Sequence, residues 1–294
     1  MNAKEEKMIE RQKRQQQEQL LIKKGLEQIE GISLNHRIVN KSSAKLDLED
    51  NSVDLVVTSP PYYNAKEYAH WDNIESYLKD MKPILKECFR TLKPGRKFCL
   101  NISDIPIKGA SGVCWLPLGA YWLSLAEQVG FELADRIFWF KTPIKGFQYG
   151  SLPFPPSPLI CDSMEYVYVL RKPGKADYAY VEKPFKEASR LPRSEYAEFT
   201  KQIWSIPRVK LTSNINGHIA PFPQEIPFRC IKMYSFVGDV ILDPFAGSGT
   251  TAVAAMDTRR NSVMYEIKKE YAEMIYNRLK NAKSLFCKDK IKRA

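Results

Sequence analysis

The chain of 294 residues lacks several patterns that would define its class. No stretch approaches the roughly 18 uninterrupted apolar residues that a membrane span needs. The segment Met1 to Lys24 is charged and rich in glutamine, without the apolar core of a secretory signal. We therefore expect a cytoplasmic protein.

Paired cysteines and clustered histidines are also missing. The six cysteines stand singly, none in a C-x-x-C pair, and the three histidines lie far apart in the sequence. This spacing argues against a disulfide scaffold and against a zinc site, so we expect no metal. Small, buried, apolar side chains are the plain interpretation for most of the cysteines.

Acidic residues are fewer than basic ones, which leaves a formal net charge of +11. Such a surplus suits a polyanionic partner, because neutralising phosphates supplies affinity that is independent of base sequence. Taken alone the signal is weak, since many basic proteins bind no nucleic acid. The length suits one large α/β domain with an insertion, or two small domains.

The apolar pattern predicts alternating strands and helices over two separate stretches. Residues 1–30 are expected to form a charged helix or a disordered arm, and the pattern is irregular and rich in proline over about 141–213. The alternation predicts an α/β fold, with a mostly parallel, doubly wound sheet and helices on both faces. The expected strands are 53–57, 98–102, 131–140, 164–170, 240–243 and 261–267. The expected helices are 74–92, 116–129, 223–234, 249–256 and 268–283. Pro83 is expected to kink or split the first of these helices, and Lys93-Pro94-Gly95 to stop it.

One stretch with chemical meaning is Asp243-Pro244-Phe245-Ala246-Gly247-Ser248-Gly249-Thr250-Thr251, at a strand–loop–helix junction. Glycines allow close approach of a ligand, and a helix N-terminus favours a carboxylate or phosphate. A P-loop would need a lysine after the second glycine, and a dinucleotide loop would need a third glycine. Glu266, at the end of the next strand, is suited to accept two ribose hydroxyls, with a solvated strand end as the alternative.

The other stretch is Ser59-Pro60-Pro61-Tyr62, at the end of a buried strand. The exocyclic amine of a nucleobase is a poor nucleophile because its lone pair is conjugated into the ring. A serine hydroxyl and a proline carbonyl are acceptors for its N–H groups, and a tyrosine ring offers a stacking surface. A strand end capped by a Pro-Pro turn is the alternative interpretation.

Together the two stretches resemble the amino-group (N4-cytosine and N6-adenine) DNA methyltransferases, over about Ile38 to Leu279. D-P-F-x-G-x-G-T-T is similar to the cofactor motif of that family, and T-S-P-P-Y to its catalytic motif. The catalytic motif comes first here, which is the permuted "beta" order. His218-Ile219-Ala220-Pro221-Phe222-Pro223 resembles the H-P-A-P-F-P segment of the family. Upstream of the catalytic strand the family often has Gly-Asp, whose Asp touches the cofactor adenine; this chain departs from that pattern with Lys41-Ser42-Ser43, where Ser43 is the candidate for the contact.

The resemblance implies a circularly permuted, Rossmann-like methyltransferase fold that binds S-adenosyl-L-methionine and methylates a base flipped out of double-stranded DNA. Ser59, Pro60, Pro61 and Tyr62 would be catalytic. The cofactor would be bordered by Ser43, Phe222, Asp243, Phe245, Gly247, Ser248, Gly249, Thr250 and Glu266. A serine at the first catalytic position favours cytosine N4 as the target, with adenine N6 as the alternative.

The resemblance also predicts a division of the chain: 31–140 as the catalytic half, 141–215 as a mostly inserted target-recognition region, and 216–294 as the cofactor half. Basic side chains in and near the insertion are candidates for contacts with phosphates or guanine edges, namely Lys141, Lys145, Arg171, Lys172, Arg190, Arg193, Arg208 and Lys210. A cognate restriction endonuclease is a possible partner, and the protein is expected to be a monomer or homodimer. A non-catalytic DNA-binding protein and an RNA or protein methyltransferase are the remaining alternatives.

Overall fold

The computed structural model describes residues 3–63, 70–109, 112–142, 160, 162–209, 222–282 and 289–294. The segment 218–221, which carries part of the resemblance, lies outside these residues, as do Lys145 and Lys210. Much of the predicted insertion lies outside them as well.

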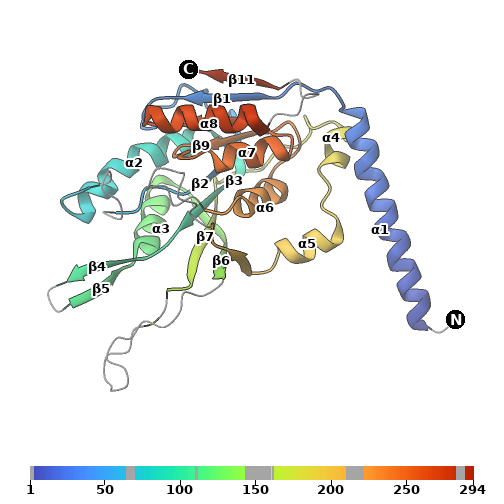
Figure 1. The fold of residues 1–294 in the computed structure, drawn as a ribbon, viewed down its shortest axis with the longest axis horizontal. Coiled ribbons are helices and arrows are strands. Elements are labelled where there is room, and N and C mark those ends of the chain that lie inside the picture. Colours follow the sequence, from blue (N-terminus) through green and yellow to red (C-terminus); the bar gives the residue numbers. More distant parts are fainter. Residues whose placement is uncertain are drawn as a thin grey trace.

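A nine-stranded sheet forms the centre of the molecule, in the order β11-β1-β10-β9-β2-β3-β7-β6-β8 (Figure 1). All neighbouring strands are parallel except where β7 meets β3 and β6. The strands of this sheet are β1 (Asn35–Val39), β2 (Val53–Thr58), β3 (Leu92–Ile102), β6 (Glu132–Thr142), β7 (Met164–Arg171), β8 (Ile203–Pro207), β9 (Val240–Asp243), β10 (Asn261–Tyr265) and β11 (Lys290–Arg293). A separate hairpin pairs β4 (Ile105–Gly109) with β5 (Gly112–Leu116).

Helices cover both faces of the sheet, as the alternating pattern predicted. They are α1 (Ala3–Gln28), α2 (Ile74–Thr91), α3 (Leu118–Val129), α4 (Lys183–Ala188), α5 (Arg193–Phe199), α6 (Glu225–Tyr234), α7 (Thr250–Asp257) and α8 (Lys269–Ala282). Alternate residues of β2 point to opposite sides: Val56 joins the core under α2 and α3, whereas Leu55 and Val57 join the core under α6 and α7. The mostly parallel, doubly wound fold is thereby confirmed.

Local signals place the ends of two helices. Asn73 caps α2, since its side chain accepts from the backbone N–H of Ser76, and the Ser76 hydroxyl accepts in return from the backbone N–H of Asn73. Gly130 ends α3 at φ +112, a conformation that glycine adopts without strain. Pro83 lies inside a continuous α2, so the helix is not split.

The expected stop signal after α2 acts differently. The helix already ends at Thr91, and Lys93-Pro94-Gly95 lies inside β3. Gly95 has φ +73 there, and an added Cβ would meet the backbone nitrogen of Ala176 at 2.4 Å. The triplet is therefore an irregular start to the strand rather than a helix stop, and the register of β2 against β3 shifts beside it.

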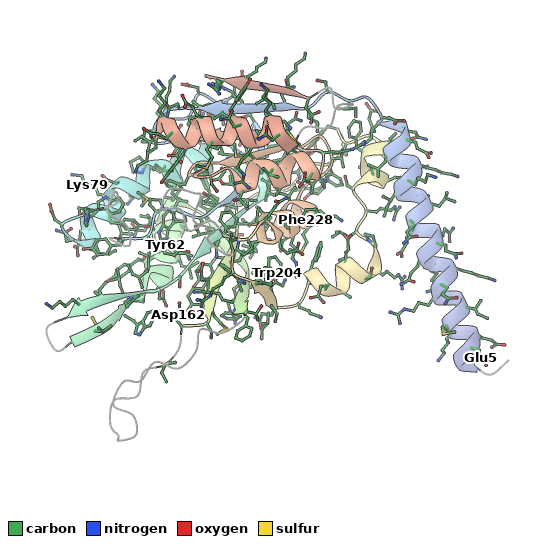
Figure 2. The ribbon with its side chains drawn as sticks, viewed as in Figure 1. Glu5, Tyr62, Lys79, Asp162, Trp204 and Phe228 are labelled. Atoms are coloured by element: carbon green, nitrogen blue, oxygen red, sulfur yellow. The ribbon has the colours of Figure 1, made fainter. Side chains whose placement is uncertain are left out.

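Several elements had no clear sequence signal. The short strands β1 and β11, at one side of the sheet, were not predicted, nor were β8 and the small helices α4 and α5. Two strands within 141–215, β7 and β8, belong to the central sheet. The N-terminal segment is a helix, the first of its two predicted forms; it contacts α4, and Glu5 lies toward its far end, away from the sheet (Figure 2).

Candidate active site

The two motifs with chemical meaning meet at one edge of the sheet. Strand β2 pairs with β9 in parallel, with Leu55 opposite Ile241 and Val56 opposite Leu242. The carboxyl ends of both strands therefore lie side by side, although about 185 residues of chain separate them. The hydroxyl of Thr58 donates to Oδ1 of Asp243 over 2.6 Å, which joins the strand before the Ser59 tetrapeptide to the strand before the glycine loop.

Asp243 is buried at this junction. Besides Thr58, the carboxylate accepts from the backbone N–H of Phe245 at 3.0 Å and from the Thr251 hydroxyl at 2.7 Å. Burial raises the pKa of Asp243 to about 6, and the hydrogen bonds from Thr58, Thr251 and the backbone oppose that shift. The carboxylate thus ties β2, the loop after β9 and the first turn of α7 together.

The glycines of the loop have different constraints. At Gly249 (φ +80) a Cβ would lie 2.9 Å from Cγ1 of Ile275, so the close approach of α8 requires glycine there. At Gly247 (φ +50) a Cβ would meet only the carbonyl oxygen of Phe245, at 3.9 Å. Gly247 therefore borders open space. No side-chain oxygen caps the start of α7, which leaves the helix N-terminus available to an anion.

Glu266 faces this loop. Oε2 accepts from the backbone N–H of Gly247 at 2.8 Å, and Oε1 accepts from that of Lys268 at 2.9 Å. Each carboxylate oxygen can accept two hydrogen bonds and accepts one here, so acceptor capacity remains for ligand hydroxyls. Burial raises the pKa of Glu266, and the two backbone hydrogen bonds counter this shift.

Of the other predicted cofactor residues, all but Phe222 lie in this loop or next to it. The Ser43 hydroxyl donates to the carbonyl of Pro244 at 2.8 Å, so Ser43 is next to the cofactor motif. Ser248 is held by Arg278, which donates to its carbonyl oxygen at 2.6 Å and to its hydroxyl at 3.1 Å. Phe245 packs on the core under α2 and α3, whereas Phe222 packs on the core under α6. The hydroxyls of Thr250 and Ser248 lie 3.3 Å apart.

The tetrapeptide from Ser59 to Tyr62 directly follows β2. Pro60 is buried, whereas Ser59 and Tyr62 are half-buried and remain accessible to a ligand. The carbonyl of Pro61 accepts from the Tyr77 hydroxyl at 2.9 Å, and that hydroxyl accepts from Nε1 of Trp122 at 2.8 Å. A buried bridge from α3 through α2 thus fixes the backbone of the tetrapeptide.

Tyr62 points toward β7, where its hydroxyl donates to Oε2 of Glu165 at 3.0 Å. Burial and the nearby Glu165 carboxylate raise the pKa of Tyr62 well above its ordinary value, and a hydrogen bond with Ser59 acts in the opposite direction. Asn101 of β3 donates to the same carboxylate oxygen at 3.2 Å. A third strand end therefore joins the site.

The predicted nucleic-acid cations fall into two groups. Lys141 is buried, with 8% of its side chain exposed, and pairs with Asp162 and Glu165, so it is no free surface cation. The other described positions are exposed or half-buried, and each has a partner within the chain: Arg171 pairs with Glu132, Lys172 bonds Asn51, Arg190 pairs with Glu187, Arg193 pairs with Glu18, and Arg208 bonds the Asp162 carbonyl.

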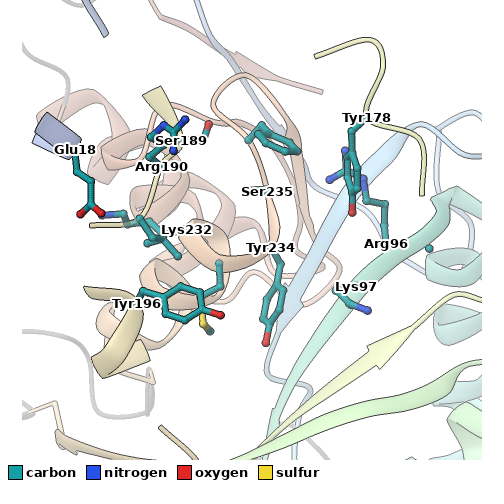
Figure 3. A pocket seen from close by; sticks show the side chains of 14 residues that line it. Glu18, Arg96, Lys97, Tyr178, Ser189, Arg190, Tyr196, Lys232, Tyr234 and Ser235 are labelled. Atoms are coloured by element: carbon teal, nitrogen blue, oxygen red, sulfur yellow. The ribbon is translucent and has the colours of Figure 1, made fainter. Parts of the chain in front are cut away.

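A cavity of about 490 Å³ lies elsewhere, between α1, the end of α6 and the start of β3 (Figure 3). Lys97, Tyr178, Tyr196 and Tyr234 are among its lining residues. The start of β3 is the opposite end of the strand from Asn101, so this cavity is separate from the site described above. Among the described residues, no group of three or more His, Cys, Asp or Glu side chains is placed to hold a metal ion.

Sequence reasoning missed several residues of the site. Thr58 and Thr251 lie within the two motifs, so their hydroxyls next to named site residues were a usable signal. Arg278, Asn101 and Glu165 had no such signal, because only the tertiary fold brings their helix and strands to the two motifs.

The chain is similar to known DNA methyltransferases. The family model of N6/N4 DNA methylases matches residues 53–277. The type II methyltransferase M.MjaI of Methanocaldococcus jannaschii is 34% identical over 281 residues, which cover 84% of this chain and 92% of that protein. The type II beta methyltransferase M.BslI of Bacillus sp. (strain NEB-606) is 37% identical over 246 residues. That match covers 79% of this chain but only 26% of M.BslI, so the chain spans about a quarter of that relative.

Solved structures share the fold. TTHA0409 of Thermus thermophilus, solved with S-adenosyl-L-methionine, superposes with a TM-score of 0.73 at 30% identity, covering 88% of this chain and 99% of that one. PvuII DNA methyltransferase (cytosine-N4-specific) has the same fold, with a TM-score of 0.63 at 22% identity, covering 86% and 94%. Within the described residues, no helix has the length and apolar character to cross a membrane. The chain belongs to the N6/N4 DNA methylase family.

Proposed function

We propose that this protein transfers a methyl group from S-adenosyl-L-methionine to the exocyclic N4 amine of cytosine in double-stranded DNA. One observation carries the proposal. The acceptor tetrapeptide that begins at Ser59 and the glycine loop that follows Asp243 lie on neighbouring strand ends, joined by the hydrogen bond between Thr58 and Asp243. A ligand in the loop and a base beside the tetrapeptide would therefore be neighbours.

The residues present fit this cofactor. The space beside Gly247 admits a ligand against the backbone, and the uncapped start of α7 suits a carboxylate. Glu266 retains acceptor capacity for ribose hydroxyls. The residues proposed to hold the cofactor are Ser43, Phe222, Asp243, Phe245, Gly247, Ser248, Gly249, Thr250 and Glu266. When bound, S-adenosylmethionine supplies a methyl group that its sulfonium already activates.

The protein's own contribution is orientation. The hydroxyl of Ser59 and the carbonyl of Pro60 accept the amine N–H groups, which draws the nitrogen lone pair out of conjugation. Pro60 and Pro61 have no backbone N–H donors, so neither proline competes with the target amine for those acceptors. The ring of Tyr62 offers the flipped base a stacking surface. Holding reactants in line supplies most of the rate in such a transfer.

The choice between cytosine and adenine rests on Ser59. A neutral hydroxyl at this position is commoner in the cytosine N4 enzymes that the sequence resembles, and Asp or Asn is commoner in the adenine N6 enzymes. Both kinds of side chain accept the same N–H, so adenine N6 is the second candidate. The mechanism is the same for either base.

The wider role follows from the same site. We infer that the segment 141–215 contributes to target recognition and that the net charge of +11 assists binding to phosphates. We place the protein in the cytoplasm beside a cognate restriction endonuclease, since both relatives named above are type II methyltransferases.

Product analysis tests the proposal. Purified protein is incubated with S-adenosylmethionine and unmethylated bacterial DNA, which is then digested to nucleosides for mass spectrometry. N4-methylcytosine is the expected product. N6-methyladenine would keep the chemistry and reverse the base assignment. An unmethylated DNA despite measurable cofactor binding would contradict the proposal, and parallel incubations with RNA and protein would then identify another acceptor.

A further inference from the structure

We propose that Glu165 is a positioning residue, which holds the catalytic Tyr62 by its hydroxyl group and thereby fixes the ring against which the target base stacks. The inference rests on the proposed function, because it specifies how the same site orients its base. Glu165 stands near the start of β7, outside both sequence motifs.

The contacts of Glu165 come from three neighbouring parts of the chain. Oε2 accepts from the Tyr62 hydroxyl at 3.0 Å and from Nδ2 of Asn101 at 3.2 Å. Oε1 lies 3.2 Å from Nζ of Lys141, which also binds Asp162 at 2.8 Å. The carboxylate therefore links the loop after β2 to β3 and β6. Figure 2 shows Tyr62 in the body of the molecule and Asp162 on the segment before β7.

The ion pair between Glu165 and Lys141 is buried at a position where stability alone does not require it. The side chains of Glu165 and Lys141 are 14% and 8% exposed. Removing two charges from water is unfavourable, and well-packed apolar residues commonly stabilise a core as well as a buried ion pair does. The pair provides a hydrogen-bond acceptor in a fixed position at the hydroxyl of Tyr62.

Two different side chains therefore hold the tetrapeptide in place. The Tyr77 hydroxyl holds the backbone at the Pro61 carbonyl, and Glu165 holds the ring of Tyr62. Burial raises the pKa of Tyr62 further above neutral pH, and its hydroxyl is a donor to Glu165. The Tyr62 ring is held at its hydroxyl by Glu165, and the backbone beside it is held by Tyr77, so the ring presents one face to the base. Small misplacements of reacting groups lower the rate strongly.

A double-mutant cycle tests the inference. The variants are Tyr62→Phe, Glu165→Leu, Glu165→Gln, and Tyr62→Phe combined with each Glu165 change. For each we would measure kcat and KM for methyl transfer to DNA, the Kd for S-adenosylmethionine, and Tm. Glu132→Leu is the matched control, because Glu132 is an exposed, ion-paired glutamate at the other end of β6.

Tyr62→Phe and Glu165→Leu are each expected to lower kcat by about ten- to a hundredfold, the range of a hydrogen bond to a charged group. Cofactor Kd should stay unchanged, and the double variant should be no slower than the slower single one. Glu165→Gln, which retains an acceptor oxygen, should recover part of the rate. If Glu165→Leu fails to fold, the Gln variants complete the same cycle.

Additive losses in the double variant, or wild-type kcat in Glu165→Leu, would overturn the inference while the wild-type protein stays active. A loss confined to Tm and cofactor binding would overturn it too, since that pattern marks a structural role. Failure of the proposed function has a different signature, because the wild-type protein would then leave DNA unmethylated in the same assay.

Discussion

The hydroxyl of Thr58 lies 2.6 Å from the carboxylate of Asp243, and this hydrogen bond joins strand β2 to strand β9. Both residues are buried. Because Thr58 directly precedes Ser59 and Asp243 opens the glycine loop, a shift of one strand against the other would displace the two halves of the site. The bond fixes their relative position.

Thr58→Val removes this donor and keeps the shape of the side chain. The buried carboxylate of Asp243 then retains the donors from Thr251 and Phe245 alone. We expect a loss of about 1–3 kcal/mol in the free energy of unfolding, larger at pH 8 than at pH 5, because the lost bond favoured the ionised form. Urea unfolding at both pH values measures it. Thr58→Ser, which retains the hydroxyl, is the control and should lose much less.

Ser59→Ala should abolish most turnover while leaving cofactor affinity intact. In the proposed mechanism this hydroxyl accepts from the target amine, so its loss is expected to lower kcat roughly a hundredfold, as for other single groups that stabilise a transition state. Radiolabelled methyl transfer and calorimetric binding separate the two effects. Ser52→Ala is the control, since that hydroxyl donates to the Glu49 carbonyl away from the site. A fully active Ser59→Ala variant would show that the assigned role is wrong.

The titration of Asp243 predicts a pH dependence of cofactor binding. With a pKa of about 6, its carboxyl loses its negative charge as the pH falls below that value. The raised pKa of Glu266 acts in the same direction. S-adenosylmethionine carries a net positive charge, so its Kd should rise roughly tenfold between pH 8 and pH 5, which corresponds to ~1.4 kcal/mol.

S-adenosylhomocysteine lacks the sulfonium charge and is the control ligand for this experiment, with an expected smaller change. An equal change for both ligands would contradict the electrostatic explanation. The titration of Asp243 also changes the folding stability with pH, in a direction set by its pKa shift. The native pKa lies above the ordinary value of 3.8, so the contribution of Asp243 to stability falls as the pH rises from about 4 to 6.

The two glycines of the loop should respond differently to alanine. Gly249→Ala places a methyl group 2.9 Å from Ile275 at φ +80, and we expect a loss of about 3 kcal/mol in the free energy of unfolding. Gly247→Ala meets only a backbone oxygen at 3.9 Å, so the loss should be about 1 kcal/mol, with weaker cofactor binding instead. Thermal unfolding and calorimetry distinguish the two. Similar Tm values for both variants would contradict this difference.

Much of the fold could be predicted from local pattern. The apolar runs of β2 and β9 and the helical spacing of α2 and α8 reappear in the structure within a few residues of their predicted bounds. Short strands such as β1 and β11 could not be predicted in this way, because pairing with a neighbour, rather than apolar content, makes them strands.

In the candidate site, too, some features follow from the local sequence and others only from the tertiary structure. The sequence by itself determined the two motifs, because a hydroxyl, two prolines and an aromatic ring, or a glycine loop with an acid beyond it, have their chemistry whatever surrounds them. Only the tertiary structure decided that Lys141 is buried against Glu165 instead of facing DNA, and that Glu165 reaches Tyr62. The physical reason is that a side chain's type is local, whereas its burial and partners depend on strands that meet only when the sheet has formed.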